Sequence, residues 1–255
     1  MTSDSQPRES SDTPPIVVKN LHKSFDEQAV LNGIDLMVAE RNTVTVLGRS
    51  GTGKSVLLKL IIGLQHPDSG SICIHGKETT GLNFNALNRV RKKVGFLFQG
   101  AALYDSLTIA ENVAFPLDRD RKMSASEQKD RVRELLASVG METHLDKLPS
   151  QISGGMQKRV GLARALALEP DILLFDEPTA GLDPITAGEI GRLIVELKNK
   201  SKITSVVVTH DIRGAKTFSD RVVLLDHGKI VMEGTFEDLE KSKDKFVIQF
   251  LTGCS

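Results

Sequence analysis

The sequence is poor in aromatic residues and has no excess charge of either sign. It contains no tryptophan and one tyrosine among 255 residues, so it offers few rings for the stacking platforms that bind single-stranded nucleic acid. Its 33 lysine and arginine residues balance 33 aspartate and glutamate residues. Without a net basic field, general attraction to nucleic acid or to an anionic membrane surface is not expected.

Long apolar runs and cysteines are also scarce. The longest apolar runs, such as residues 172–175 and 222–225, are far shorter than the ~20 residues that cross a bilayer. The two cysteines, Cys73 and Cys254, lie far apart without metal-ligand spacing, which argues against a disulfide framework or a zinc site. Residues 1–15 carry three acidic residues and no apolar stretch, which predicts a disordered tail rather than a leader. We therefore expect no direct insertion into a membrane.

Short β-branched runs alternate with helical patterns from residue 16 onward, which predicts βαβ units around a mainly parallel sheet. The expected core strands are residues 43–47, 94–98, 171–175, 205–209 and 221–225. A smaller antiparallel part is expected to contain residues 16–20, residues 71–75 and a hairpin turn at residues 226–228. Between residues 100 and 149 polar helices take over, notably at 124–139, which predicts a helical insert in the α/β core.

Residues 48–55 read GRSGTGKS and satisfy the phosphate-loop pattern GxxxxGK[ST]. A strand-like TVTVL precedes them and the helical spacing of VLLKLIIGL follows, which is the context that the motif requires and an isolated glycine-rich turn lacks. In such a loop, backbone N–H groups and the lysine bind phosphate oxygens, and the last hydroxyl ligates Mg²⁺. The predicted nucleotide-binding residues are Gly48, Arg49, Ser50, Gly51, Thr52, Gly53, Lys54 and Ser55.

Two carboxylates, Asp176 and Glu177, end the apolar run of residues 172–175. Such a pair at the end of a buried strand is costly unless a metal ion and a water molecule use it. Asp176 suits the Mg²⁺ shell, and Glu177 is placed to orient and deprotonate an attacking water molecule. Taken alone, the pair is equally typical of a helix N-cap that follows a strand, but the phosphate loop upstream favours the catalytic interpretation.

Ser153, Gly154 and Gly155 precede the long helical pattern MQKRVGLARALAL. As an isolated motif, a serine and two glycines before a helix indicate an ordinary N-cap. Exposed backbone N–H groups at the positive end of a helix, together with a hydroxyl, can also bind a phosphate. One chain cannot easily direct this site and the phosphate loop at the same phosphate group.

The order of the motifs resembles that of the ABC ATPase family. After the phosphate loop come a glutamine that ends a strand at Gln99, the SGG signature, the carboxylate pair, an AGLD loop at residues 180–183 and a strand-end histidine at His210. The resemblance covers residues 16–240 and implies a P-loop NTPase fold of the α/β class. Its RecA-like parallel sheet carries a small antiparallel β part and a helical subdomain inserted at about residues 100–165, and a short segment, residues 241–255, follows.

The resemblance also implies ATPase activity with MgATP in a head-to-tail homodimer. The phosphate loop of one copy and the signature of the other then close over each ATP, and Phe25 lies under the adenine. The implied Mg²⁺ ligands are Ser55, Gln99 and Asp176, and the implied catalytic residues are Lys54, Gln99, Glu177, Asp183 and His210. Of these, Asp183 crosses the dimer interface and His210 holds the γ-phosphate and the water. Without the family, His210 would be read as a capping or packing histidine and Phe25 as a core residue.

Two positions depart from the commoner family pattern. Met156 stands where the signature more often has glutamine, and its side chain cannot donate a hydrogen bond, although the backbone donors of residues 153–155 remain. Arg49 replaces a frequent proline of the phosphate loop, where the backbone matters more than the side chain. Neither change argues against hydrolysis.

Within the family, the local sequences resemble the ATPases of Mce-type lipid transporters, the MlaF-like group. The similar segments are residues 48–59, 98–117, the SGGM signature and GLDPIT at 181–186. This implies a peripheral subunit at the cytoplasmic face of a bacterial inner membrane, with an integral membrane permease and an Mce-domain lipid-binding protein as partners. The alternatives are an ABC ATPase for amino acid uptake or lipoprotein release, and a soluble assembly or regulatory ABC ATPase that serves no transporter.

One segment is expected to contact the permease. Residues 100–117 follow Gln99 and, by the family resemblance, lie near a groove that receives a permease helix. The apolar residues expected there are Leu103, Tyr104, Leu107, Val113 and Phe115. The alternative for these residues is plain packing inside the helical subdomain.

Overall fold

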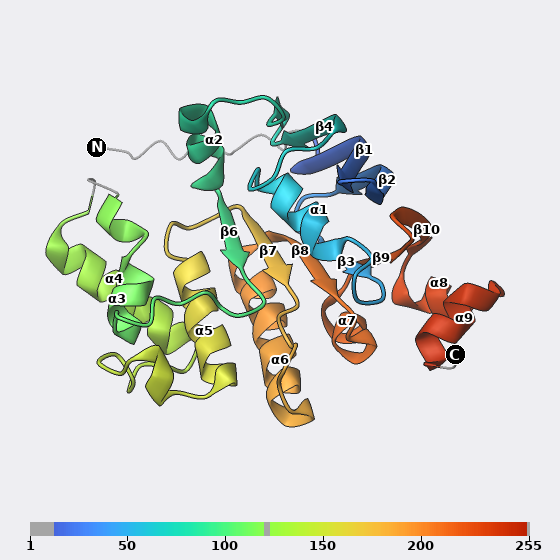
Figure 1. Cartoon of the computed structure of the whole chain (residues 1–255). Coiled ribbons are helices and arrows are strands. Elements are labelled where there is room, and N and C mark those ends of the chain that lie inside the picture. Colours follow the sequence, from blue (N-terminus) through green and yellow to red (C-terminus); the bar gives the residue numbers. More distant parts are fainter. Residues whose placement is uncertain (1–12, 120–122, 254–255) are drawn as a thin grey trace, which may run out of the picture.

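The computed structural model describes residues 13–119 and 123–253, and two sheets organise this part of the chain (Figure 1). The larger sheet has six strands in the order β10-β9-β3-β8-β7-β6, and all neighbours except β9 and β10 pair in parallel. Its strands are β3 (Thr43–Leu47), β6 (Val94–Leu97), β7 (Ile172–Asp176), β8 (Thr204–Thr209), β9 (Arg221–Asp226) and β10 (Lys229–Gly234). The five predicted core strands are therefore confirmed.

The central strands are buried because helices cover both faces of the sheet. Every residue of β3, β7 and β8 is buried, as expected for continuous apolar runs in a doubly covered parallel sheet. On one face, Leu174 and Val206 pack in a cluster with helix α1 (Lys54–Ile61). On the other, Leu173 and Val207 pack in a second cluster with α5 (Gly154–Ala165) and α6 (Pro184–Ser201). Helices α1 and α5 thus lie on opposite faces.

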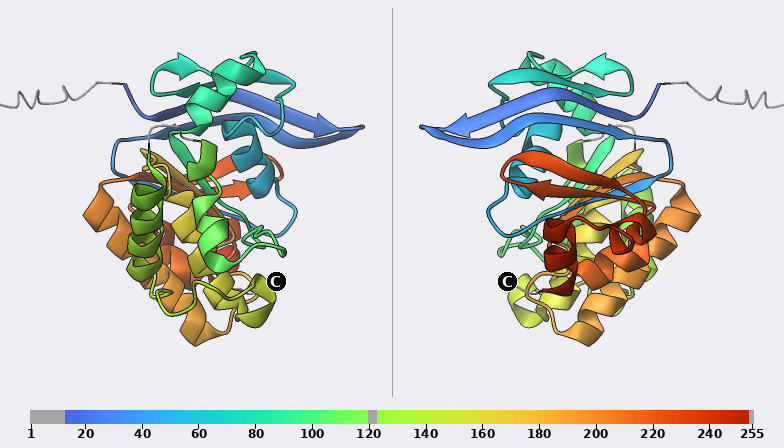
Figure 2. Two further views of the ribbon diagram at one scale, coloured as in Figure 1. Left: turned by 90° about the vertical axis from the view of Figure 1, so that its left-hand side faces the viewer. Right: turned by 90° about the vertical axis from the view of Figure 1, so that its right-hand side faces the viewer.

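The smaller sheet has four antiparallel strands in the order β2-β1-β4-β5. They are β1 (Ile16–Phe25), β2 (Gln28–Val38), β4 (Ser69–Ile74) and β5 (Lys77–Glu78). This sheet lies over α1, which is sandwiched between the two sheets in Figure 2. The antiparallel part predicted around residues 16–20 and 71–75 is confirmed. Of the predicted tail, residues 1–12 lie outside the described residues, and Pro15 already accepts a hydrogen bond from the His75 backbone N–H at 2.9 Å.

The hairpin predicted at residues 226–228 is present but belongs to the other sheet. It joins β9 to β10 through His227 and Gly228, whose φ angles of 42° and 72° lie in the left-handed region. Because β9 pairs in parallel with β3, the hairpin extends the six-stranded sheet. Its assignment to the antiparallel part was therefore wrong, although the Gly228 carbonyl accepts a hydrogen bond of 2.8 Å from the Asn32 backbone in β2.

Helices fill the stretch of chain between β6 and β7. They are α3 (Ile109–Ala114), the 3₁₀ turn η1 (Leu117–Arg119), α4 (Ala125–Ser138), the 3₁₀ turn η2 (Pro149–Gln151) and α5. The helix predicted at 124–139 is confirmed as α4, and a capping box of Ser124 and Glu127 closes its N-terminus. None of the helices within residues 13–119 and 123–253 combines the length and apolar character needed to span a bilayer.

The remaining helices are α2 (Phe84–Arg91), α7 (Ile212–Phe218), α8 (Phe236–Glu240) and α9 (Lys245–Thr252). The last of them, α9, lies within the segment that follows residue 240. It buries Val247 and Phe250 against Leu224 of β9 in a third apolar cluster, which also contains Leu239 of α8. The described C-terminal residues are therefore packed beside the end of the central sheet, at the right of Figure 1.

Candidate active site

The phosphate loop, residues 48–55, folds around its own lysine. The Lys54 ammonium is 5% exposed and donates hydrogen bonds of 2.8 Å to the carbonyl oxygens of Gly48 and Arg49. Gly48 is pressed against β9, because an added Cβ would lie 2.5 Å from the Leu225 carbonyl oxygen. Gly53 has a φ of 98°, which a residue with a side chain rarely adopts. The glycines thus let the backbone wrap closely around a buried cation.

The carboxyl end of β7 brings two carboxylates to the phosphate loop. Asp176 accepts a hydrogen bond of 2.6 Å from the Ser55 hydroxyl, and Glu177 Oε1 lies 3.7 Å from the Lys54 ammonium. Burial lowers the pKa of Lys54 while the Glu177 charge opposes that shift. Burial also raises the pKa of Asp176, against the Ser55 hydrogen bond. A hydroxyl and a buried carboxylate in contact form the hard oxygen pair that Mg²⁺ prefers, so these residues fit that ion.

Glu177 is the most constrained residue of the site. Its φ of 47° is in the left-handed region, and its N–H donates to the Val208 carbonyl at 2.9 Å. Its Oε2 accepts a hydrogen bond of 3.0 Å from the Thr209 hydroxyl and lies 3.0 Å from His210 Nδ1. The carboxylate, itself buried, therefore has a fixed direction, and the exposed imidazole of His210 lies beside it at the surface.

A buried lysine that sequence reasoning missed lies behind these groups. Lys158 of α5 is 4% exposed, and its ammonium donates to the backbone carbonyls of Gln99 and Glu177, the latter at 3.0 Å. The sequence contains one signal for its burial. Lys158 lies three residues after Gly155 and four before Leu162, a spacing that places all three on one helix face, and both of these neighbours are buried. The side chain of Gln99 itself is exposed.

The structure does not bring the other predicted residues to the phosphate loop. Ser153 is the N-cap of α5 and accepts a hydrogen bond of 3.3 Å from the Met156 N–H, while Gly154 beside it is exposed. Asp183 is the N-cap of α6, and its hydrogen bonds to Thr186 lower its pKa. Helices α5 and α1 cover opposite faces of the sheet, and in the described residues no hydrogen bond or ion pair joins residues 153–155 to the phosphate loop.

Phe25 lies near the loop without contributing to its hydrogen bonds. It ends β1 with 42% of its surface exposed, and the Lys23 ammonium lies 5.3 Å from its ring centroid. The following residues 28–30 line a groove of about 320 Å³ together with residues 49–52 and 226–228. The hairpin that carries Phe25 therefore borders the phosphate loop.

A glycine loop that wraps a buried lysine between β3 and α1, with carboxylates at the end of β7, defines a nucleotide-hydrolysing P-loop protein. The model of the ABC transporter family matches residues 31–180, and the chain belongs to this family. It is accordingly an ATPase that uses ATP with Mg²⁺. When bound, Mg²⁺ neutralises charge on the β- and γ-phosphate oxygens.

Two groups of relatives illustrate the family. The methionine import ATP-binding protein MetN of Brucella abortus is 40% identical over 243 residues, which cover 94% of this chain and 66% of the relative. The probable ribonucleotide transport ATP-binding protein mkl of Mycobacterium tuberculosis is 41% identical over 252 residues, which cover 97% of this chain and 70% of the relative. The chain thus spans about two thirds of the length of these curated relatives.

Solved structures agree with this assignment. A dimeric ATP-binding cassette in a post-hydrolysis state, bound to ADP and Pi, matches with a TM-score of 0.80 and 36% identity, over 87% of this chain and 98% of that one. The protein cbiO1 from Clostridium perfringens, part of the cbiONQ ABC transporter complex, matches with a TM-score of 0.83 and 29% identity, over 94% of this chain and 96% of that one. The P-loop NTPase fold predicted from the sequence is therefore confirmed.

Proposed function

We propose that this ATPase powers lipid transport by a bacterial complex of the Mce type, in which two copies close head to tail over MgATP and move a membrane permease. The observation that carries the ATP-dependent part is the contact of Glu177 with Lys54 and His210 at the end of β7. The lipid part rests on local sequence resemblance in residues 48–59, 98–117 and 181–186. The subunit would act from the cytoplasmic face of the inner membrane.

In this proposal Glu177 accepts the proton of the attacking water, because its carboxylate is held by Thr209 and faces the surface where His210 lies. Lys54 binds the transferred phosphate, and Ser55, Asp176 and Gln99 ligate Mg²⁺. His210 holds the γ-phosphate and the water from the other side. Phe25 packs under the adenine at the neighbouring hairpin, where its ring is exposed.

The closed dimer is supported by the separation of the two anion-binding loops within one chain. Residues 153–155 begin α5 and the phosphate loop precedes α1, and these helices cover opposite faces of the sheet. In this proposal a second copy supplies the missing half of each site. Asp183, at the exposed N-terminus of α6, would then reach the partner. A similar solved cassette is a dimer, which agrees with this arrangement.

Substitution of Glu177 with glutamine tests the chemistry and the dimer together. Glu177→Gln keeps the shape and a carbonyl oxygen but removes the base, so MgATP should bind, close the dimer and remain unhydrolysed. We expect size-exclusion chromatography with MgATP to give a dimer peak that wild type, which turns ATP over, lacks. A purely monomeric profile for Glu177→Gln would contradict the head-to-tail mechanism.

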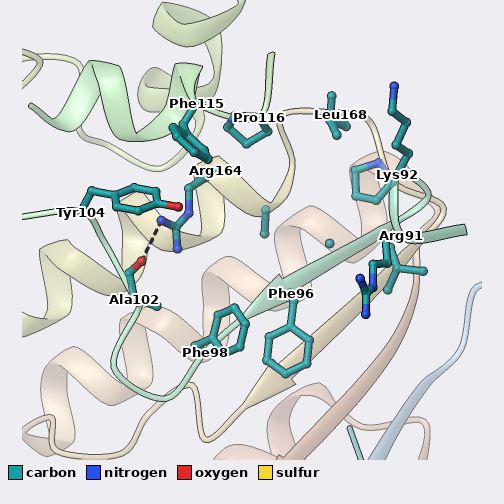
Figure 3. Close-up of a pocket in the computed structure, with 14 residues that line it drawn as sticks. Arg91, Lys92, Phe96, Phe98, Ala102, Tyr104, Phe115, Pro116, Arg164 and Leu168 are labelled. Carbon is teal, nitrogen blue, oxygen red and sulfur yellow. Dashed lines mark hydrogen bonds between the residues drawn. The ribbon is translucent and has the colours of Figure 1, made fainter. Parts of the chain in front are cut away.

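The proposed permease contact is an apolar groove between β6 and the helical segment (Figure 3). Its volume is about 400 Å³, and the rings of Tyr104 and Phe115 form one wall with centroids 4.6 Å apart. In Figure 3 the Arg164 side chain lies beside the Tyr104 ring and below Phe115, and it donates a hydrogen bond of 2.8 Å to the Ala102 carbonyl. Tyr104 is 46% exposed, so the groove offers an apolar surface that a helix from another protein can cover.

Only Tyr104 and Phe115, of the five residues expected at this groove, line it. Val113 is fully buried in the second apolar cluster and Leu103 packs against the same cluster, so plain packing accounts for both. Leu107 does not line the groove either. Tyr104 and Phe115 are therefore the two residues whose substitution tests the proposed contact with the permease.

The charge of the groove indicates what its partner carries. Arg91, Lys92 and Arg164 line it, whereas no carboxylate does, and within the described ranges none of the three forms an ion pair. The guanidinium groups of Arg91 and Arg164 are instead bonded to backbone carbonyls. A permease helix with an apolar face and an acidic residue would complement such a surface.

Charge substitutions in the groove should uncouple the complex. We expect Tyr104→Glu and Phe115→Glu to lose copurification with the permease while they bind MgATP as wild type does. Tyr104→Phe keeps the ring and serves as the control. Lys92→Glu should weaken the complex, whereas Lys129→Glu on the exposed face of α4 should not. If all of these variants retain the permease, the groove is not its docking site.

The transported molecule is the second question. The relatives named for methionine import favour amino acid uptake as the other candidate function. Affinity purification from native membranes, followed by protein and lipid mass spectrometry and by transport assays in reconstituted vesicles, separates the two. An Mce-domain protein and ATP-dependent lipid transfer would support lipid transport. Recovery of an amino acid permease would replace it with uptake, and recovery of no membrane protein would contradict any transport role.

A further inference from the structure

Lys158 lies where three functional segments of the chain meet. It belongs to α5, the helix that begins after Ser153, and its ammonium points away from solvent with 4% of the residue exposed. Its hydrogen bonds run to the carbonyls of Gln99, just after β6, and of Glu177, just after β7. One side chain thus connects the SGG helix with the backbone of two residues of the active site.

The position is costly to maintain. Burial lowers the pKa of Lys158, and the nearby Asp176 and Glu177 carboxylates only oppose that shift from a distance. Within the described residues its ammonium has no carboxylate at ion-pair distance, so backbone carbonyls provide its hydrogen bonds. A buried ammonium without a direct counterion is rare, which indicates a role other than packing.

The backbone of Glu177 explains what the ammonium stabilises. Glu177 has a left-handed φ of 47°, a conformation that costs free energy in a residue with a side chain and persists only when its surroundings fix it. Its N–H donates to Val208 at 2.9 Å, and its carbonyl accepts from the Ala180 N–H at 3.2 Å and from Lys158 at 3.0 Å. Lys158 is therefore the side chain that fixes the carbonyl side of this strained residue.

We propose that Lys158 is a positioning residue for ATP hydrolysis: it ties the Glu177 backbone and the Gln99 segment to α5, so that the water-activating carboxylate is aligned only while α5 is docked. This proposal rests on the role given to Glu177 above. It also provides a mechanical link, because a movement of α5 relative to the sheet would pull on both carbonyls together. Nucleotide binding at the phosphate loop does not depend on this link.

The test compares two variants. Lys158→Met keeps most of the side-chain volume but removes the hydrogen-bond donor, whereas Lys158→Arg retains donors and the positive charge. We expect Lys158→Met to lower kcat by about tenfold to a hundredfold, as for other small displacements of reacting groups, with KM for MgATP within about threefold of wild type. Lys158→Arg should recover most of the loss. Arg159→Gln is the matched control, because Arg159 bonds Val139 and Glu189 away from the site.

A second measurement does not depend on activity. Without nucleotide, hydrogen exchange at the backbone N–H groups of Glu177, Thr179 and Ala180 should speed up in Lys158→Met and return toward wild type in Lys158→Arg. A wild-type kcat in Lys158→Met, or equal changes of kcat and KM together with a general increase in exchange, would overturn the positioning role. Glu177→Gln, measured in parallel, tests the base assignment on which the positioning role rests. If Glu177→Gln hydrolyses ATP normally, both ideas fail; if it is inactive while Lys158→Met keeps the wild-type kcat, only the positioning role fails.

Discussion

The chain contains two glycine-bearing loops that open a helix, and one copy of the chain completes only the first of them. At the phosphate loop, Lys54 is buried, held by two carbonyls and faced by the carboxylate of Glu177. At the start of α5, the Ser153 hydroxyl bonds the helix N–H group of Met156, and Gly154 is exposed. A site for phosphate transfer needs both charge neutralisation and an enclosed surface, and the second loop provides neither by itself.

The N-terminus of α5 also differs from those of three other helices in the described residues. Helices α3, α4 and α8 each carry an acidic residue that closes a capping box, Glu111, Glu127 and Asp238 respectively. Helix α5 has no acidic residue in its first turn, so its positive end is not compensated by its own side chains. Helix α2 begins in the same way, at Asn83 and without an acidic residue in its first turn, so our proposal of an anionic ligand at α5 rests on the SGG sequence rather than on this difference.

The largest effect is expected at the phosphate loop, residues 48–55. Lys54→Ala removes the buried cation of the phosphate loop, so hydrolysis should fall at least about a hundredfold and nucleotide affinity should drop as well. Phosphate release and equilibrium binding of a fluorescent ATP analogue measure the two losses. Lys216→Ala, which breaks an exposed ion pair with Glu240, is the control and should leave both unchanged. Hydrolysis at the wild-type rate by Lys54→Ala would show that the site is assigned wrongly.

The next largest effect is expected at residues 153–155, where α5 begins. Ser153→Asp keeps a good N-cap for α5, so the fold should persist, but it directs a negative charge at the place proposed for the phosphate of the partner copy. In a Glu177→Gln background, this change should abolish the MgATP-dependent dimer while binding of MgATP by the monomer stays within about threefold of its value. Size-exclusion chromatography and equilibrium binding separate the two outcomes.

Ser124→Asp makes the same chemical change at the N-cap of α4, where the structure shows an ordinary capping box. It should leave the dimer intact. If the dimer survives Ser153→Asp, or if Ser124→Asp abolishes it equally, the proposal that residues 153–155 bind the phosphate of a second copy is wrong.

Local patterns predicted the central sheet well because its strands are short β-branched runs that a doubly covered sheet buries throughout. They missed β2, in which Gly33 has a φ of 75° and the register with β1 shifts, so the alternation of buried residues is interrupted. They also assigned the hairpin at 226–228 to the wrong sheet. The sheet that it joins depends on the pairing of β9 with β3, a contact between distant parts of the chain that no local pattern encodes.

The same limit applies to the site. The contact of Ser55 with Asp176 follows from motif positions, because carboxyl ends of parallel strands meet at one edge of a sheet. The role of Lys158 could not be predicted in this way, since its partners are backbone carbonyls after β6 and β7 and any residue type supplies a carbonyl. A partner that is a side chain restricts the residue type at its position, so it can be found in a sequence. A backbone carbonyl does not restrict the residue type, so the partners of Lys158 could not be found in this way.

The smallest expected effect extends the comparison to the unusual residue of the phosphate loop. The Arg49 carbonyl accepts hydrogen bonds from Lys54 and from the Thr52 hydroxyl, at 2.8 and 2.9 Å, while its side chain leaves the loop. The guanidinium carbon lies 5.8 Å from the ring centroid of Phe246 in α9, within reach of a cation–π interaction. The phosphate loop is therefore connected to α9. The start of α5 packs instead against α6, because an added Cβ at Gly155 would lie 2.4 Å from the Thr186 side chain.

An exposed cation–π contact contributes ~0.5–1 kcal/mol, so Arg49→Gln and Phe246→Leu should each weaken MgATP binding by no more than about fivefold. If the two side chains act through each other, the double variant should bind no more weakly than the single ones, because both remove the same contact. Equilibrium binding over this mutant cycle is the measurement, with Ile248→Ala on the exposed face of α9 as the control. Effects that add in the double variant would mean that α9 packs beside the loop without supporting it, and the contrast between the two loops would then rest on Lys54 and the carboxylates of β7 alone.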